Sequence, residues 1–354
     1  MSGRVVVALS GGVDSSVAAA LLAEQGREVV GITLALAGDA SRCCSLADAE
    51  DARRVAERLG VRFYVANYRD RFRQEVIDAF ADDYLAGRTP IPCVACNQRF
   101  KFHYLMERAS ALGAERVATG HYARVERDEA GGGWRLLRGR DRAKDQSYYL
   151  FDLSQDQLAR IEFPLGDLCK PEVRERARAL GLRTADKPES QEICFVPDGD
   201  YARVVEALRP DALPGSGEIV DEAGRVLGRH RGIHRFTVGQ RRGLGLASDR
   251  KLYVKRIDAP HNRIVVAGLE GLGSGGARLE RVSWIAGKAP ARPVRARVQV
   301  RYRHEGADAR IDPLPGGACL RFDEPVRAVA PGQAAVFYAG ETVLGGGWIA
   351  EALA

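Results

Sequence analysis

A glycine-rich turn near the N-terminus has the composition of a phosphate-binding loop. Ser10-Gly11-Gly12-Val13-Asp14-Ser15 follows the apolar run 4–9 and precedes a helical pattern that ends before Gly26. At such a junction the main-chain N–H groups and the helix dipole favour an anion, and glycine lets the backbone approach it. Asp14 could orient the turn or reach a magnesium ion. The simpler alternative is an ordinary turn in which Asp14 or Ser15 only caps the helix.

Two cysteines lie in segments that suit sulfur chemistry. Cys96 belongs to the proline-set loop Pro90-Ile-Pro-Cys93-Val-Ala-Cys96-Asn97, just before an expected helix whose positive end lowers the pKa of a thiol. Cys194 lies in the polar stretch 189–195, outside any apolar core pattern. For any one cysteine the alternative is an inert buried thiol; we expect this for Cys169 and Cys319 and leave Cys43 and Cys44 open.

Composition indicates a multidomain globular protein. A chain of 354 residues, 45% hydrophobic and 28% charged, exceeds the size at which a single core keeps growing. Its seven cysteines are too few for a secreted disulfide scaffold, and an odd number cannot all be paired with one another. No apolar run is long enough to cross a bilayer, and the first residues lead directly into a strand pattern. We therefore expect a cytoplasmic protein with no membrane partner.

The order of the expected elements predicts an α/β fold. Apolar runs at 4–9, 29–36, 61–66 and 116–119 alternate with helical patterns at 14–25, 45–59 and 100–112, which predicts a Rossmann-like parallel sheet. A glycine-rich tip within 126–134 predicts a hairpin. Beyond residue 200, short strands and turns predict a small central mixed domain and a C-terminal β-barrel. We expect boundaries at 1–199, 200–272 and 273–354.

Positive charge is concentrated in the second half of the chain. Residues 1–199 carry 29 basic and 30 acidic side chains, whereas residues 200–354 carry 24 and 17. In the strand-like run 294–303, Arg295, Arg297, Arg301 and Arg303 share one face with no acid between them. That face could bind phosphate or could simply be solvated. A basic cluster among glycines at 230–242 also suits an RNA backbone.

The phosphate turn differs from the commoner nucleotide loops. It lacks the Gly-Lys-Ser/Thr ending of a Walker loop and the third spaced glycine of the dinucleotide fingerprint. It resembles the signature of the PP-loop ATP pyrophosphatases, which cleave ATP between its α- and β-phosphates to adenylate a substrate oxygen. The resemblance implies that ATP and Mg²⁺ are bound by Ala8, Leu9, Ser10, Gly11, Gly12, Val13, Asp14 and Ser15, with adenine near Leu34 and Gly120 at the ends of neighbouring strands.

Over nearly its full length the chain resembles the tRNA-specific 2-thiouridylase family. Six separate motifs carry the resemblance: Ser10–Ser16, Pro90–Asn97 with Phe100-Lys101-Phe102, Ala118–Ala123, Lys144–Tyr148, Glu192–Phe195 and Thr237–Leu244. It implies ATP-dependent 2-thiolation of the wobble uridine of certain tRNAs through an adenylated base. Cys96 would be the nucleophile and Cys194 the carrier of a persulfide loaded by a cysteine desulfurase or a sulfur relay. The cycle would end in a Cys96–Cys194 disulfide.

The family resemblance also predicts RNA contacts and shows one departure. The tRNA contacts that we expect are His121, Lys144, Asp145, Gln146, Arg301, Tyr302 and Gln333. Family members often have Asp at the position of Cys93, and proton transfer has been assigned to it, so a thiol puts that role in doubt. Cys93, Cys96 and Cys194 could instead be ligands of a [4Fe-4S] cluster with one iron open to sulfide, although Cys-x-x-Cys is also common in zinc and redox sites.

Two other functions are compatible with parts of the pattern. Another PP-loop adenylating ligase, acting on tRNA or a small molecule, would share the ATP turn but would not need paired cysteines. A non-catalytic RNA-binding or metal-binding module could retain the turn without its activity. Cys96 and Cys194 distinguish the first alternative from sulfur transfer, and release of pyrophosphate from ATP with tRNA distinguishes the second.

Overall fold

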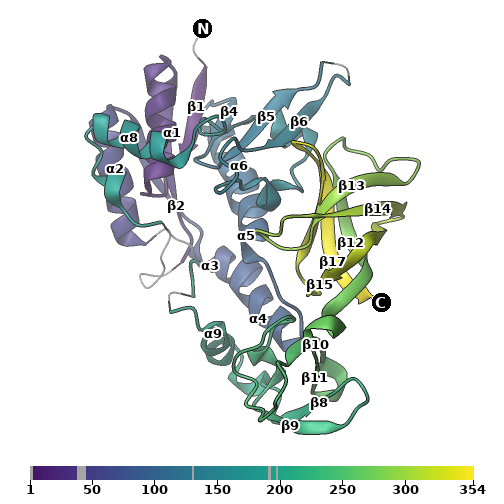
Figure 1. The fold of residues 1–354 in the computed structure, drawn as a ribbon. Coiled ribbons are helices and arrows are strands. Elements are labelled where there is room, and N and C mark those ends of the chain that lie inside the picture. The colour runs from purple at the N-terminus through teal and green to yellow at the C-terminus, as the bar shows by residue number, and fades with distance from the viewer. Residues whose placement is uncertain (1–2, 38–44, 130, 190–192, 197) are drawn as a thin grey trace.

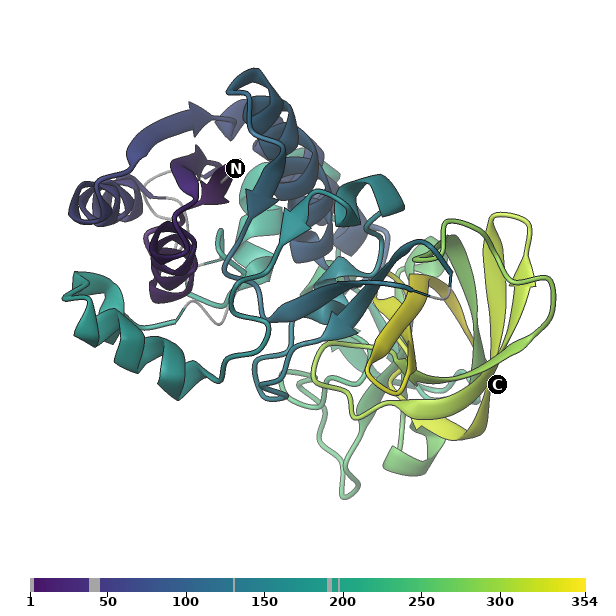
Figure 2. The ribbon, with the colours of Figure 1, turned by 90° about the horizontal axis from the view of Figure 1, so that it is seen from above.

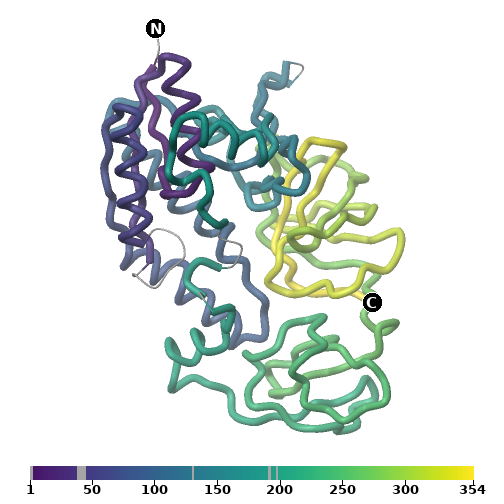
Figure 3. The backbone as a smooth tube through the Cα atoms, turned by 60° about the vertical axis from the view of Figure 1, so that its left-hand side comes forward, coloured from purple at the N-terminus to yellow at the C-terminus, as the bar shows by residue number. Residues whose placement is uncertain are grey.

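The computed structural model describes residues 3–37, 45–129, 131–189, 193–196 and 198–354. Cys43 and Cys44, and residues 190–192 of the motif before Cys194, lie outside the described residues. The chain forms an N-terminal α/β part, a central part and a C-terminal barrel (Figure 1). The central part lies below the other two, as the tube trace shows (Figure 3). No helix among the described residues is both long and apolar enough to cross a membrane.

The N-terminal part contains the expected parallel sheet. Its strands are ordered β3-β2-β1-β4-β7, and neighbouring strands pair in parallel. Their bounds are β1 (Arg4–Ala8), β2 (Glu28–Ala35), β3 (Arg62–Asn67), β4 (Arg116–Ala118) and β7 (Ile161–Glu162). Both faces of β1 are buried: Val5 and Val7 belong to one apolar cluster and Val6 to another. A continuous apolar run, without alternating polar residues, is typical of a strand that is buried on both faces of its sheet.

Helices cover both faces of this sheet. On one side lie α1 (Val13–Glu24), α2 (Leu46–Leu59) and α8 (Lys170–Ala179) (Figure 2). The capping box expected at Ser45 is present, since its Oγ accepts from Asp48 N at 3.1 Å and its N–H donates to the Asp48 carboxylate at 3.0 Å. Further helical segments are α3 (Arg69–Phe72), η1 (Arg73–Ile77), α4 (Asp78–Leu85), η3 (Ser147–Leu150), α7 (Gln155–Leu158) and η4 (Arg183–Asp186).

The helix that carries the cysteine pair begins earlier than the sequence predicted. A continuous helical run consists of α5 (Pro92–Ala95), the π-helix η2 (Cys96–Tyr104) and α6 (Leu105–Ala111). We expected a loop up to Asn97 and a helix from Phe100, and this was wrong. Proline is favourable in the first turn of a helix, where its missing N–H would have no partner, so Pro92 starts the run. Cys93 therefore lies in the first turn and Cys96 in the second.

The central part contains a four-stranded sheet of order β10-β11-β8-β9. Only the β11–β8 pairing is parallel. The elements of this region are α9 (Tyr201–Leu208), η5 (Pro210–Ala212), β8 (Gly217–Val220), β9 (Val226–His230), η6 (Ile233–Arg235), β10 (Tyr253–Asp258), η7 (Ala259–His261), β11 (Arg263–Ala267) and η8 (Leu269–Leu272).

The expected C-terminal barrel is confirmed. Its strands pair in the order β12-β15-β14-β13-β16-β17, and β17 pairs again with β12, so the sheet closes (Figure 2). The bounds are β12 (Gly273–Trp284), β13 (Val294–Gln299), β14 (Ala307–Leu314), β15 (Gly317–Arg327), β16 (Ala334–Ala339) and β17 (Thr342–Leu353). The predicted strand 294–303 is shorter than expected: β13 ends at Gln299, and Arg303 has a positive φ of 62°.

The hairpin predicted within 126–134 connects the N-terminal part to the barrel. It is formed by β5 (Ala123–Arg127) and β6 (Trp134–Arg138). β6 pairs with β17, with Leu137 opposite Thr342 and Leu136 opposite Val343. The barrel sheet is thus extended by two strands from the first half of the chain, which fixes the barrel beside the α/β part.

Candidate active site

The turn after β1 has the geometry of an anion site. Gly12 is the N-cap of α1, and as a glycine it has no side chain that could cap the helix. The hydroxyls of Ser15 and Ser16 donate instead to the Gly12 oxygen, at 3.2 and 2.8 Å, and Ser10 N donates to Ser15 Oγ at 3.1 Å. These side chains therefore hold the turn and do not cap the helix. The first N–H groups of a helix have no intrahelical acceptor, so the start of α1 favours an anion.

Two glycines allow this turn to pack closely. Gly11 has φ +71°, and a Cβ there would lie 2.1 Å from the Asp48 main-chain oxygen. A Cβ on Gly120, which follows β4, would lie 2.7 Å from the main chain of Asp14 and Ser15. The end of β4 is thus in direct contact with the phosphate turn. Leu34 is buried near the end of β2, and its contact with adenine stays a prediction.

Asp14 is held by two groups from distant segments. Its carboxylate accepts from the Tyr122 hydroxyl at 2.8 Å and from Lys170 Nζ at 2.8 Å to each oxygen. Burial and the Asp14 charge raise the pKa of Tyr122, so the phenol keeps its proton and donates. Of the two roles expected for Asp14, this geometry favours orientation of the turn.

Lys187 holds the other side of the turn. Its ammonium donates to the Gly11 oxygen at 3.0 Å and to the carboxylates of Asp48 and Asp51, at 2.7 Å each. Burial lowers the pKa of Lys187, but the hydrogen bonds to the two aspartates outweigh it, so the pKa is raised and the group stays charged. Sequence reasoning missed both Lys170 and Lys187. The only local signal at Lys170 was a helix start, because Pro171 and Glu172 follow it.

The two cysteine segments pack against one apolar cluster. Cys96 and Cys194 are both partly buried against the core that contains Phe72 and Phe100. The Phe72 ring lies 5.3 Å from Phe100 and 6.1 Å from Phe195, centroid to centroid. Phe100 is four residues after Cys96, and Phe195 directly follows Cys194. The two cysteine segments therefore pack against the same core, and a meeting of the two sulfur atoms stays a prediction.

The barrel contacts the same region. Tyr302, just after β13, lies against Tyr149 with ring centroids 4.6 Å apart. Tyr149 contacts the cysteine helix, since its main-chain oxygen accepts from Asn97 Nδ2 at 3.3 Å, and burial and the nearby Cys93 raise its pKa. Gln333, before β16, donates from Nε2 to the Thr89 oxygen at 3.0 Å, three residues before the start of the cysteine helix. Residues from the two halves of the chain thus meet around Cys93.

Comparisons with known proteins agree with this arrangement. Family models match in three places: the tRNA methyl transferase HUP domain over residues 3–198, the tRNA methyl transferase PRC-barrel domain over 206–268 and the Aminomethyltransferase beta-barrel domain over 274–349. The tRNA-specific 2-thiouridylase MnmA of Solibacter usitatus is 51% identical over 98% of this chain and 98% of its own length. That of Geobacter metallireducens is 52% identical over 99% of this chain and 97% of its own.

The chain belongs to the tRNA-specific 2-thiouridylase family. A solved structure of the U34-tRNA thiolase NcsA from Methanococcus maripaludis is 17% identical and aligns with 60% of this chain and 69% of that one. The TM-score of this alignment is 0.37.

The tRNA contacts predicted from the 2-thiouridylase family stay predictions, and the structure gives their surroundings. His121 is buried, with Nδ1 2.6 Å from Thr119 Oγ1, and burial and Lys101 hold its pKa well below the usual value. Lys144 pairs with Glu189 at 2.6 Å. Gln146 Oε1 accepts from Tyr122 N at 3.1 Å.

The Asp145 carboxylate is hydrogen-bonded inside the protein. Its carboxylate accepts from Arg138 at 2.9 Å, and from the main chain of Gly139 and the main chain and hydroxyl of Ser147 at 3.0–3.1 Å. The Arg138 guanidinium lies 3.5 Å from the ring centroid of Tyr338 in the barrel. Asp145 therefore orients Arg138 and Ser147, and these two residues contact Tyr338 of the barrel.

The arginine face of residues 294–303 carries less unpaired positive charge than the sequence predicted. Arg295 forms an ion pair with Asp323 on β15, and Arg297 is 3.7 Å from Asp308 on β14. Arg301 donates to the Arg327 main-chain oxygen at 3.1 Å. This acceptor is uncharged, so the contact does not neutralise the positive charge of Arg301. The segment 294–303 itself contains no acidic residue, because the acidic partners come from the neighbouring strands β14 and β15.

In the basic cluster at 230–242 the four arginines are exposed and their contact with RNA stays a prediction, whereas the two histidines lie inside the protein. His230 and His234 are buried, and burial lowers the pKa of His230. His230 Nδ1 accepts from Gly232 N at 3.0 Å, while its Nε2 contacts the Asn262 oxygen at 3.1 Å. His234 Nε2 lies 2.9 Å from Glu206. These histidines hold the central part together and cannot follow an RNA backbone.

A metal cluster on the three cysteines is not favoured. Across the described parts of the chain, which include Cys93, Cys96 and Cys194, no group of three or more His, Cys, Asp or Glu side chains is placed to hold a metal ion. We therefore derive no step through an iron–sulfur cluster.

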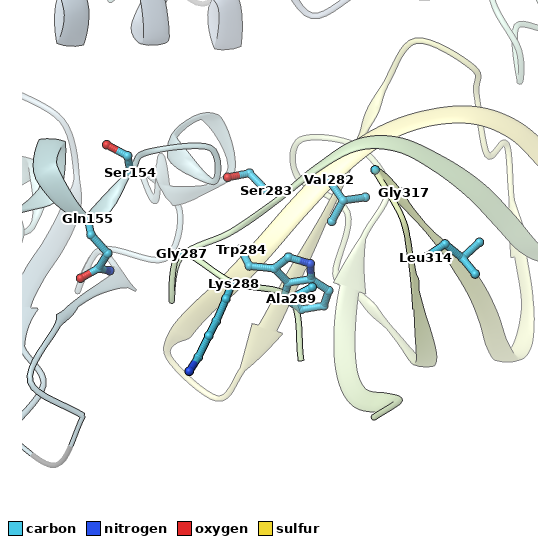
Figure 4. Close-up of a pocket in the computed structure, with 11 residues that line it drawn as sticks. Ser154, Gln155, Val282, Ser283, Trp284, Gly287, Lys288, Ala289, Leu314 and Gly317 are labelled. Atoms are coloured by element: carbon cyan, nitrogen blue, oxygen red, sulfur yellow. The ribbon is translucent and has the colours of Figure 1, made fainter. Parts of the chain in front are cut away.

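A surface pocket elsewhere is unrelated to these residues. It has a volume of about 370 Å³ and lies between the start of α7 and the barrel, with Gln155, Trp284, Lys288 and Leu314 in its lining (Figure 4). None of the predicted site residues lines it.

Proposed function

We propose that this protein is an ATP-dependent tRNA-uridine 2-sulfurtransferase that acts on the wobble uridine and converts ATP to AMP and pyrophosphate. The observation that carries the proposal is the pairing of a phosphate turn with two cysteine segments packed on one core. Membership of the tRNA-specific 2-thiouridylase family, at about half identity over almost the whole chain, supports it. An adenylating ligase would use the turn without the cysteines.

Residues of the turn prepare the adenylation step. The first-turn N–H groups of α1 bind the phosphates, while Lys170 and Lys187 hold the turn through Asp14 and Gly11. The lysines also lower the cost of gathering negative charge there. Mg²⁺ neutralises phosphate charge when it is bound with ATP. The uridine 2-oxygen attacks the α-phosphorus of ATP and pyrophosphate leaves, so the 2-carbon gains an AMP leaving group.

The cysteines then deliver sulfur. The terminal sulfur of a Cys194 persulfide forms a bond to the activated 2-carbon and AMP leaves with its electron pair. The Cys96 thiolate attacks Cys194 Sγ and the S–S bond to the base breaks, which leaves 2-thiouridine and a Cys96–Cys194 disulfide. A dithiol reductant then returns both cysteines to thiols.

The partners follow from this chemistry. The substrate is tRNA, and the sulfur comes from a cysteine desulfurase or a relay protein that transfers a persulfide. We place the reaction in the cytoplasm. The tRNA-binding residues that we expect around the uridine are His121, Lys144, Asp145, Gln146, Arg301, Tyr302 and Gln333. Tyr302 and Gln333 contact residues beside the cysteine helix.

One assay separates this function from its alternatives. The protein is incubated with ATP, Mg²⁺, unmodified tRNA and a persulfide donor, and both pyrophosphate and thiolated tRNA are measured. We expect both products in equal amounts. Pyrophosphate without thiolated tRNA under all donor conditions would indicate another adenylating ligase, and no pyrophosphate would indicate a non-catalytic module.

A further inference from the structure

The barrel turn that precedes β16 holds the segment that leads into the cysteine helix. The main-chain N–H of Thr89 donates to the Pro331 oxygen at 2.8 Å, and the Thr89 oxygen accepts from Gln333 Nε2 at 3.0 Å. Both main-chain polar groups of Thr89 are therefore bonded to one turn of the barrel. Thr89 is buried, so leaving either group without a partner would be costly.

Gly332, in the middle of this turn, allows the close contact. Its φ is +90°, and a Cβ at this position would lie 2.9 Å from both the N and the O atom of Thr89. The turn is anchored in the barrel on its other side, since Gly332 N donates to the Ile349 oxygen at 2.9 Å and Ile349 N donates to the Gln333 oxygen at 2.8 Å. Any side chain at position 332 must therefore push the turn and Thr89 apart.

A short, stiff stretch of chain connects Thr89 to the cysteines. The intervening segment 90–92 contains two prolines, whose rings fix the φ angle. Pro92 begins α5, and the helical run continues without a break through Cys96. A displacement of Thr89 is therefore passed to the first two turns of the helix, where Cys96 lies.

Gly316 shows what a turn of the same barrel looks like without such a contact. It lies between β14 and β15 with φ +70°, and a Cβ there would have no atom within 4 Å. Alanine strains the backbone at either glycine, because both have a positive φ. The two positions differ in that only Gly332 of this pair touches Thr89.

We propose that Gly332 is a positioning residue that holds the start of the cysteine helix through Thr89 and thereby sets where Cys96 meets Cys194. The inference rests on the proposed function. The hydrogen bonds that hold the phosphate turn come from other segments of the chain, so Gly332 affects sulfur transfer more than adenylation.

The test compares Gly332→Ala with Gly316→Ala and wild type. It measures thiolated tRNA formed per pyrophosphate released, with saturating ATP and tRNA and a persulfide donor. In Gly332→Ala we expect this ratio to fall at least about threefold below wild type, because a displacement of about 1 Å can cost about 10²-fold in a positioned reaction. Pyrophosphate release should stay within about twofold, since changes outside the reacting groups usually have small effects. Gly316→Ala should keep the wild-type ratio.

Amide hydrogen exchange checks the displacement itself. Exchange at the Thr89 N–H, which is bonded to the Pro331 oxygen, should become faster in Gly332→Ala and stay at the wild-type rate in Gly316→Ala. A fall in the ratio without faster exchange at Thr89 would place the cause elsewhere and contradict the proposal.

A purely structural role predicts a different result, since loss of folded protein lowers both products in proportion. An unchanged ratio in folded Gly332→Ala would therefore overturn the proposal, whatever the exchange rate at Thr89.

If Gly332→Ala does not fold, Gln333→Ala decides, because it removes one of the two hydrogen bonds to Thr89 without inserting an atom. A ratio equal to wild type contradicts the inference and a lower one supports it, whereas a lost tRNA contact would lower both products together. If wild type itself forms no thiolated tRNA, the proposed function fails, and this is seen independently of the variants.

Discussion

The Tyr122 hydroxyl donates a hydrogen bond to the Asp14 carboxylate at 2.8 Å. Tyr122 follows the end of β4, whereas Asp14 lies in the first turn of α1. The bond joins the phosphate turn to the strand end at Gly120, which also touches the turn. Together with Lys170, it fixes Asp14 before any nucleotide arrives.

Asp14→Ala should abolish pyrophosphate release. The variant loses the orientation of the turn, and among the described residues it leaves Lys170 with Glu189 as its one remaining charged partner. We expect the protein to stay folded with its free energy of unfolding lowered by about 1–3 kcal/mol. Urea unfolding and a pyrophosphate assay measure the two effects. Unchanged pyrophosphate release from folded Asp14→Ala would show that Asp14 does not orient the site.

Cys93→Ala should be largely tolerated. A persulfide relay needs only Cys96 and Cys194, whereas a cluster would need all three thiols. We expect thiolation within about threefold of wild type, as side-chain changes outside the reacting groups usually have small effects. The measurement is the thiolation rate, with iron and acid-labile sulfide analysis of anaerobically purified protein. Iron-loaded wild type together with an inactive, iron-free Cys93→Ala would establish a cluster mechanism.

Arg301→Ala should flatten the salt dependence of tRNA binding. Each lost phosphate contact lowers the logarithmic slope by nearly one unit. Arg295→Ala is a matched control, because its guanidinium is already paired with Asp323 and should leave the slope unchanged. Affinities measured over a range of salt concentrations provide the slopes, and ATP affinity should not change in either variant. An equal loss of slope in both variants would mean that the strand face acts as a whole.

Because His121 is buried, we expect the free energy of unfolding to fall at acidic pH. Burial and Lys101 hold its folded-state pKa well below the value of about 6.5 expected when unfolded. Below pH about 6.5 the unfolded chain therefore binds a proton that the folded chain excludes, and stability is lost by up to about 1.4 kcal/mol per pH unit. Above that pH the contribution is complete. The free energy of unfolding at pH 7.5 and 5.5 should thus differ less in His121→Gln than in wild type.

His103→Gln serves as the control for this measurement, because the His103 side chain is 60% exposed. It should retain the wild-type loss of stability between the two pH values. If His121→Gln loses as much stability as His103→Gln, the buried imidazole is not the source of the pH dependence.

Local patterns predicted much of the fold. The phosphate turn lies between β1 and α1 as expected, and the Ser45–Asp48 capping box forms as its spacing indicates. Continuous apolar runs became parallel strands, and the short alternating strands formed a closed barrel. These features depend on neighbours within a few residues, so the sequence contains their determinants.

Long-range contacts could not be predicted in the same way. Lys170 is 156 residues from Asp14, and Lys187 is 176 residues from Gly11. Neither lysine shows a local pattern beyond an ordinary helix start or turn. The arginine face seemed unpaired because Asp308 and Asp323 come from other strands. Pro92 was assigned to a loop although proline also suits the first turn of a helix.

The most direct test of sulfur transfer is a comparison of Cys194→Ala with wild type in the assay with ATP, unmodified tRNA and a persulfide donor. Adenylation needs neither thiol, so pyrophosphate release should persist in Cys194→Ala, and in Cys96→Ala as well, while thiolated tRNA is absent from both. Thiolated tRNA at the wild-type rate from Cys194→Ala would contradict the account, because sulfur would then reach the activated uridine without its proposed carrier.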